Sequence, residues 1–317
     1  MPNYTALAIA LVAGIAAGAA SLLGENGMLM PLMLAAPAGV YVASLGWGGI
    51  AGLIAAIAAT VTVMLGSSAT GAIVFAALSY APAAWAGYLV NLARPSPDGK
   101  GLVWYPLSGI LLRLMLALLA GFIVAGFAMG YDRAELADEL AKVFSEVIRA
   151  NPDLPPPDEA TLKANATLYV SIVPLVFPAI WLLIHVLVMQ ISVMIASRSG
   201  TLARPREDIA ANIGLPAGAL ALPLGGLVAM TLLASPGYEI GAIAAGLGIS
   251  GFALLGLASL HLGLRGRAGR GPILFANYLL LAIFTLPLIV FAVAGAWRAL
   301  RHRNGAPGGG ANSSNSE

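Results

Sequence analysis

The chain has no cysteine and very little charge. Of its 317 residues, none is Cys, three are His, and only 9% are Asp, Glu, Lys or Arg. The absence of cysteine excludes disulfides, thiolate metal ligands and a cysteine nucleophile. Because soluble domains carry charges on about a quarter of their residues, the low charge content excludes an ordinary water-soluble protein.

Motifs for nucleotide, metal and nucleic-acid binding are also missing. The sequence has no Gly-x-x-x-x-Gly-Lys-Ser/Thr and no His-Glu-x-x-His, so it lacks the P-loop and zinc-protease signatures. We therefore expect no cofactor and no metal. The net charge is +2 and the pI is near 9.0. No basic stripe with interleaved aromatic residues accompanies this charge, so we expect no nucleic-acid partner.

Long hydrophobic runs take the place of charge. Residues 26–93 contain no Asp, Glu, Lys, Arg or His, and the mean hydropathy of the whole chain is +0.89. A helix needs about 20 mostly apolar residues to cross about 30 Å of hydrocarbon, so this run accommodates three spans. The main partner of the chain is therefore predicted to be the lipid bilayer.

Turn residues and breaks in hydropathy predict an all-α, polytopic transmembrane bundle of eight to nine spans, forming one membrane domain over residues 1–297. The predicted spans lie near residues 7–23, 28–45, 50–65, 72–92, 103–129, 168–197, 213–234, 240–262 and 272–297.

One segment, residues 130–166, is polar. Apolar residues recur within it at helical spacing behind Asp132, which we expect to be a helix N-cap. The Pro-rich stretch at 151–157 ends this amphipathic helix. We expect it to lie against the protein or the interface as an outer lid, and a solvated helical loop is an equal alternative. Residues 298–317 form a basic tail that we expect to be disordered.

Basic residues suggest an orientation. The loops at 93–102, 198–212 and 264–271 fall on one side and together hold eight Lys and Arg, whereas the short breaks opposite them hold none. The positive-inside rule places these loops and the N-terminus in the cytoplasm. Nine spans, however, place the basic tail after residue 297 on the outer side, in conflict with this rule.

Few polar residues are predicted at membrane depth, where such groups usually serve a function. We expect Arg113, His185 and Gln190 to be the polar contacts of a cavity among spans 2–6 and Asn277 to pair across helices. The alternatives are an Arg113 that extends toward the headgroups and a His185 satisfied within the core. No Asp or Glu falls within a predicted span, which argues against a carboxylate-based proton pump or cation antiporter.

Two resemblances suggest a family. The C-terminal segment Phe252-Ala-Leu-Leu-Gly-Leu-Ala-Ser-Leu-His261, followed by a basic turn and Asn277-Tyr278, resembles the end of the YybS-like bacterial membrane proteins, for which no activity is implied. Met30-Pro-Leu-Met33 and Gly46-Trp-Gly-Gly49 are similar to segments of the substrate-binding subunits of energy-coupling-factor vitamin transporters. That second resemblance implies a small-molecule substrate and separate ATPase subunits.

Together these observations predict a multi-pass protein of the bacterial inner membrane, acting as a transporter subunit or permease without its own ATPase. The alternative is a non-transporting scaffold or assembly factor for envelope proteins. A third hypothesis, an intramembrane enzyme, depends on Gly66-x-Ser68 and His261, which resemble the serine–histidine pair of rhomboid-type proteases.

Overall fold

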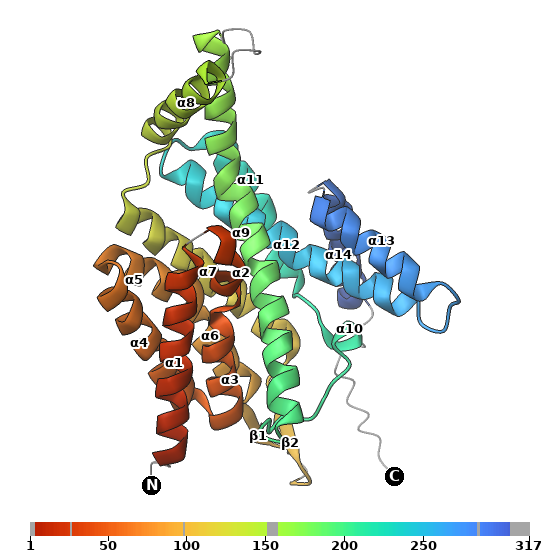
Figure 1. Ribbon diagram of the computed structural model, residues 1–317. Helices are drawn as coiled ribbons and strands as arrows, with labels where there is room; N and C mark the ends of the chain where they lie inside the picture. Colours follow the sequence, from red (N-terminus) through yellow and green to blue (C-terminus); the bar gives the residue numbers. More distant parts are fainter. Residues whose placement is uncertain (1–3, 26, 98, 151–157, 284–285, 305–317) are drawn as a thin grey trace.

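The computed structural model describes residues 4–25, 27–97, 99–150, 158–283 and 286–304 and consists mainly of helices. The longest helix, α9 (Glu159–Arg198), runs the height of the molecule, with α1–α6 on one side and α13 and α14 on the other (Figure 1). The predicted helical bundle is confirmed. At 1.5 Å per residue, the 40 residues of α9 extend about 60 Å, well beyond a bilayer core.

Seven helical units among the described residues are long and apolar enough to cross a membrane, which makes this a membrane protein. Five of the units match predicted spans 1–5: α1 (Tyr4–Gly24); η1, α2 and α3 (Gly27–Leu29, Met30–Ala35 and Pro37–Trp47); α4 (Gly49–Gly66); α5, η2 and α6 (Ala69–Phe75, Ala76–Tyr80 and Ala81–Val90); and α7 (Leu107–Met129). The other two units are α9 and α12 (Gly237–Gly263).

Small residues hold these helices close together. A Cβ added to Gly14 or Gly18 would collide with α4, at the Ala55 carbonyl and the Thr62 side chain respectively. This Gly-x-x-x-Gly spacing therefore lets the backbones of α1 and α4 approach closely. At Gly218, in contrast, a Cβ would meet no atom within 4 Å, so the same spacing there serves no close contact.

Predicted span 7 is shorter in the structure than expected. After α10 (Ile209–Asn212), residues 213–216 are not helical, and η3 (Ala217–Leu220) and α11 (Ala221–Leu232) together make a helix of 16 residues. This helix is about 24 Å long, less than the hydrocarbon core. Pro216 explains the late start, because a proline restrains the residue before it to extended conformations.

Predicted span 9 is divided. It forms two helices, α13 (Arg270–Ile283) and α14 (Leu286–Asn304), and Pro287 lies in the first turn of α14, where a proline is tolerated. Helix α14 continues to Asn304, so the first part of the predicted disordered tail is helical, while residues 305–317 lie outside the described residues.

This division removes the conflict over orientation. The Nη2 group of Arg298 donates to the carbonyls of Ala210 and Ala211, at 3.0 and 3.3 Å. Arg298 therefore lies beside the segment that follows the basic loop 198–208. The same loop is joined to the one after α12 by the Arg265–Asp208 ion pair. The arginines of α14 thus belong to the basic side.

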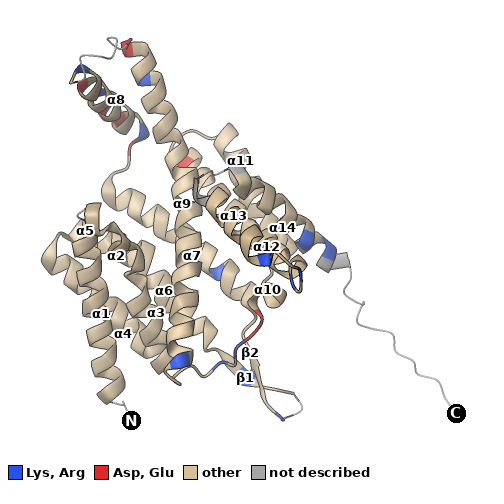
Figure 2. Cartoon of the chain, turned by 45° about the vertical axis from the view of Figure 1, so that its right-hand side comes forward, with Lys and Arg blue, Asp and Glu red and all other residues tan. Residues whose placement is uncertain are grey.

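The two ends of the bundle differ in charge: Lys and Arg predominate at one end, whereas acidic and basic residues are both present at the other (Figure 2). One end, here called the hairpin end, carries the antiparallel strands β1 (Ala93–Pro95) and β2 (Leu102–Trp104), where the sequence predicted only a loop. The other, the α8 end, carries α8 (Arg133–Arg149) packed on the start of α9. The predicted N-cap is confirmed, since Asp132 Oδ1 accepts from the backbone N–H groups of Ala134 and Glu135.

Candidate functional site

A half-enclosed cavity of about 340 Å³ lies near the α8 end, where α7, α9 and α12 meet. Its size falls in the range of small-molecule sites and is roughly twice that of a cavity of about 150 Å³ that holds benzene. Its walls are apolar and include the rings of Phe122, Phe127 and Phe177. An apolar molecule or chain therefore fits its interior.

The wall contributed by α9 is shaped by two prolines within this helix. Pro174 and Pro178 both line the cavity. Because proline has no N–H, Pro174 leaves the carbonyl of Val170 without its helical donor. The hydroxyl of Tyr131 donates to this carbonyl at 3.3 Å. The proline thus opens the helix, and a residue of the α7–α8 connection takes up the free acceptor.

Glu239 is the only charged residue among the described residues that line the cavity. It lies in the first turn of α12, where the positive end of the helix dipole favours a carboxylate. Only 7% of the residue is exposed, and neither of its carboxylate oxygens has a hydrogen-bond partner. A buried carboxylate without a donor is costly, so this group has unused capacity to accept hydrogen bonds.

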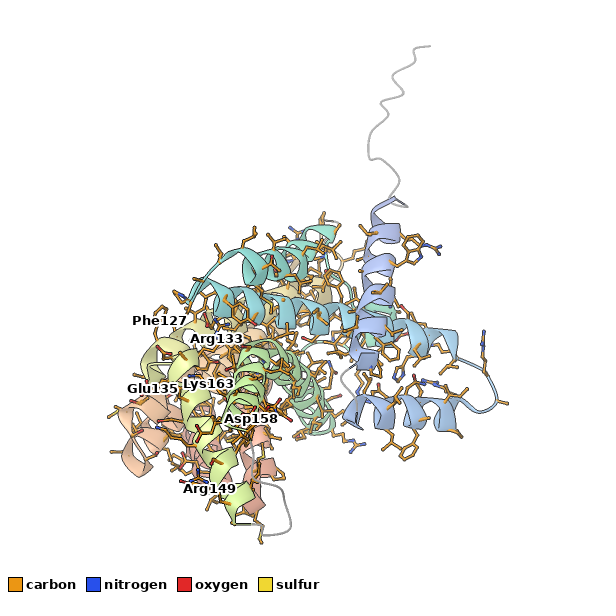
Figure 3. All side chains as sticks on the ribbon, turned by 90° about the horizontal axis from the view of Figure 1, so that it is seen from above. Phe127, Arg133, Glu135, Arg149, Asp158 and Lys163 are labelled. Atoms are coloured by element: carbon orange, nitrogen blue, oxygen red, sulfur yellow. The ribbon has the colours of Figure 1, made fainter. Side chains whose placement is uncertain are left out.

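Arg133 is the nearest cation to that carboxylate. Its Nε lies 3.6 Å from Oε1 of Glu239, which is close enough for ionic attraction and too long for a hydrogen bond. The guanidinium lies 4.2 Å from the ring centroid of Tyr238, a cation–π contact. Figure 3 looks onto this end and shows Arg133 near Phe127, with Arg149 at the far end of α8. The first residue of α8 is thus held beside the cavity.

His185 belongs to a different place, a buried cluster between α3, α9 and the π-helical turn η2. Its Nε2 and the Nε1 of Trp181 both lie 2.8 Å from the carbonyl oxygen of Leu78. Since a carbonyl only accepts, Nε2 carries the proton, and Nδ1 accepts from the hydroxyl of Tyr41 at 3.1 Å. Both ring nitrogens are satisfied, in agreement with the alternative of a structural histidine.

Arg113 does not approach this cluster. Its side chain is exposed, and its guanidinium lies 4.9 Å from the ring centroid of Tyr105. Helix α7 begins at Leu107 rather than near residue 103, so Arg113 lies less than two turns from the hairpin end and extends toward it. The expected convergence of Arg113 and His185 on one cavity is therefore replaced by two separate locations.

The remaining predicted residues do not line the cavity either. Gln190 is half-buried on α9. Asn277 donates to the carbonyl of Ile273 in its own helix at 2.8 Å, rather than across helices. Ser68 caps α5 by accepting from the N–H of Gly71, while His261 lies 2.7 Å from the hydroxyl of Tyr278. The structure thus gives Ser68 and His261 separate partners.

The sequence prediction missed Glu239 because it placed residues 235–239 in a turn between spans. Helix α12 starts at Gly237, so this carboxylate lies inside the helix and is buried. One signal was available: Glu239 is the only acidic residue between Asp208 and Glu317. A single acid in a long, otherwise uncharged or basic stretch marks a position for inspection.

Within the described part of the chain, no group of three or more His, Asp or Glu residues is arranged to hold a metal ion. Comparisons of the chain with family models, with curated proteins and with solved structures found no match.

Proposed function

We propose that the protein is a substrate-binding subunit or permease of the bacterial inner membrane, and that it binds a small molecule in the cavity between α7, α9 and α12. The observation that carries this proposal is the cavity itself, together with the buried carboxylate of Glu239 in its wall, whose oxygens have no hydrogen-bond partner. A largely apolar pocket with a few polar groups is the usual form of a ligand site.

The position of the cavity fits this role. Its walls come from α7, α9 and α12, so a molecule bound there touches helices from the first and the second half of the chain. The connection between α7 and α8 also contributes Gly130 and Tyr131. Binding would therefore affect the placement of α8. This is consistent with residues 133–150 acting as an outer lid.

The experiment is purification of the protein from native membranes, followed by mass spectrometry of small molecules and proteins that come with it. The informative variant is Gly126→Leu. Gly126 lines the cavity, and a Cβ there meets no atom within 4 Å, so a leucine side chain enters open space. We expect a molecule retained by the wild-type protein to be lost from Gly126→Leu.

Gly225→Leu is the matched control. Gly225 lies in α11, outside the cavity, and a Cβ there also meets no atom within 4 Å. This variant should retain the molecule. Equal retention by both variants, or the absence of any small molecule from the wild-type preparation, would contradict a binding role for the cavity. Co-purifying ATPase subunits would identify a separate source of energy, as in energy-coupling-factor transporters.

A scaffold for envelope proteins is the second candidate, and α8 favours it. This amphipathic helix exposes the apolar side chains of Leu136, Val143 and Val147 at the α8 end. Exposed apolar side chains on an extramembrane helix suit contact with another protein. Under this hypothesis, envelope-synthesis enzymes co-purify, and Gly126→Leu leaves their yield unchanged.

A further inference from the structure

The cavity has one feature that bears on the chemistry of its ligand, namely the sign of its charge. Among the described residues that line it, Glu239 is charged, and no Lys, Arg or His is present. Arg133 attracts the carboxylate from outside the lining, at 3.6 Å, with 30% of its own side chain exposed. The interior therefore presents a buried anionic acceptor surrounded by apolar and aromatic groups.

An ionised carboxylate only accepts hydrogen bonds, and it has about four lone-pair positions for donors. Neither oxygen of Glu239 has a hydrogen-bond partner in the structure. A ligand that brings N–H donors fills these empty acceptor positions, and a positive charge on the ligand balances the negative charge of the carboxylate. Such charge-assisted hydrogen bonds are about twice as strong as neutral ones. A carboxylate or phosphate ligand would be repelled, and a hydroxyl would supply one donor without the charge.

The aromatic residues favour the same class. The rings of Phe122, Phe127 and Phe177 line the cavity, and the negative faces of aromatic rings attract cations. Apolar walls suit an aliphatic or aromatic body. An anionic group at one side and an apolar space beside it together select a molecule with a cationic end and an apolar end.

We propose that the cavity binds an apolar amine in its ammonium form, with the ammonium group donating to Glu239 and the apolar body lying between α7, α9 and α12. The proposal rests on the proposed binding function of the cavity and specifies its ligand class. In the unliganded protein Arg133 partly neutralises Glu239. An ammonium group that binds the carboxylate therefore competes with the first residue of α8.

The test uses three probes that share an eight-carbon chain and differ in the head group: octylamine, octanol and octanoate. The full-length protein is placed in phosphatidylcholine nanodiscs, and saturable binding of each probe is measured by equilibrium dialysis, with binding to empty nanodiscs subtracted. We expect octylamine to bind about tenfold or more tightly than octanol, because its ammonium group adds a positive charge and further N–H donors to the contact with the carboxylate. A tenfold difference in affinity corresponds to about 1.4 kcal/mol of binding free energy. Octanoate should bind most weakly.

Two variants test the role of the carboxylate. Glu239→Gln keeps the size of the side chain and removes its charge, so octylamine binding should fall to the level of octanol. Arg133→Gln removes the competing cation, so octylamine binding should become tighter. A carboxylate that serves only as a structural partner of Arg133 would give no such gain. Glu146→Gln, at an exposed position on α8, is the matched control and should bind all three probes as the wild type does.

The outcomes separate this proposal from the one that it depends on. Equal binding of the three probes to the wild type, with loss of all three in Gly126→Leu, would retain the cavity and overturn the assignment of an ammonium ligand. Saturable octylamine binding that is unchanged in Glu239→Gln would overturn it as well. If no probe binds saturably, or if Gly126→Leu binds all of them normally, the cavity is no ligand site and both proposals fail.

Discussion

The cluster around His185 allows a quantitative test of whether this histidine is structural. His185 is completely buried, and its Nδ1 accepts from Tyr41 at 3.1 Å. Replacing His185 by Phe leaves the Tyr41 hydroxyl as a buried donor without a partner, at a cost of about 1–3 kcal/mol. Tyr41→Phe leaves Nδ1 without a donor, with a cost in the same range. In both variants the Leu78 carbonyl retains its bond from Trp181.

The double variant removes both partners at once. The penalty for an unpaired buried group then no longer applies, so its cost should be smaller than the sum of the two single costs. Interhelical hydrogen bonds in membranes give coupling energies that average about 0.6 and reach about 1.7 kcal/mol. Because this bond lies in a fully buried network, we expect a coupling of about 1 kcal/mol.

The assay is unfolding in mixed micelles of increasing SDS content, followed by tryptophan fluorescence. The free energy of unfolding is measured for the wild type, the two single variants and the double variant. Two results would refute the reasoning. One is additivity within about 0.3 kcal/mol, the error expected for independent sites. The other is a rise in stability in His185→Phe, as expected for a histidine held in place for a ligand.

Three further predictions follow from other contacts. Gly295→Ala should lower the free energy of unfolding by about 1–3 kcal/mol, because a Cβ there would overlap the Phe252 carbonyl of α12. Arg298→Gln should lower it by about 1 kcal/mol, since a half-buried charged group loses its hydrogen bonds to two backbone carbonyls of α10. Asp158 caps α9, and its hydrogen bonds from Thr161 lower the pKa of its carboxylate below 3.8. Stabilisation of this cap is therefore present above pH 3.8 and lost as the pH falls through the lowered value. The protection of the amides in the first turn of α9, measured as the exchange rate relative to the intrinsic rate at each pH, should fall there.

Each of these predictions has a control. Gly263→Ala lies in α12 where a Cβ meets no atom within 4 Å and should not lower stability, since alanine is the better helix former. Arg301→Gln removes only a cation–π contact with Trp297 and should cost less than Arg298→Gln. Asp158→Asn should abolish this pH-dependent loss of protection in that turn. A loss in Gly263→Ala equal to that in Gly295→Ala would show that the close contact with Phe252 does not set the cost, because helix propensity alone favours alanine over glycine.

The helical class and most spans were predictable because hydropathy and turn residues act locally. The absence of charge from residues 26–93 forces this segment into the bilayer, and Asp132 caps α8 through its own neighbours. The predicted spans at 213–234 and 272–297 differ from the structure because hydropathy is the main local signal that places them. Their composition is apolar throughout, and hydropathy alone does not report where a backbone stops being helical.

The position of polar side chains relative to one another was much less predictable. Arg113 and His185 both lie in predicted spans, yet the former extends toward the hairpin end and the latter is enclosed by α3 and η2. Which polar groups meet depends on the rotation of each helix about its axis and on the carbonyl that a proline sets free. The bond from Tyr131 to Val170 depends on tertiary packing that sequence spacing does not contain.

Glu239 also changes the argument against cation-coupled transport. The sequence placed every acidic residue outside the spans, and that absence argued against a carboxylate-based cation site. The structure places one carboxylate within α12, 7% exposed and in the wall of a cavity. A carboxylate at such a depth is costly unless a cation, a donor or a proton accompanies it. Arg133 supplies only a long ionic contact from the start of α8. A ligand that meets this carboxylate directly therefore gains from the protein's own incomplete pairing, and it competes with Arg133, the first residue of α8.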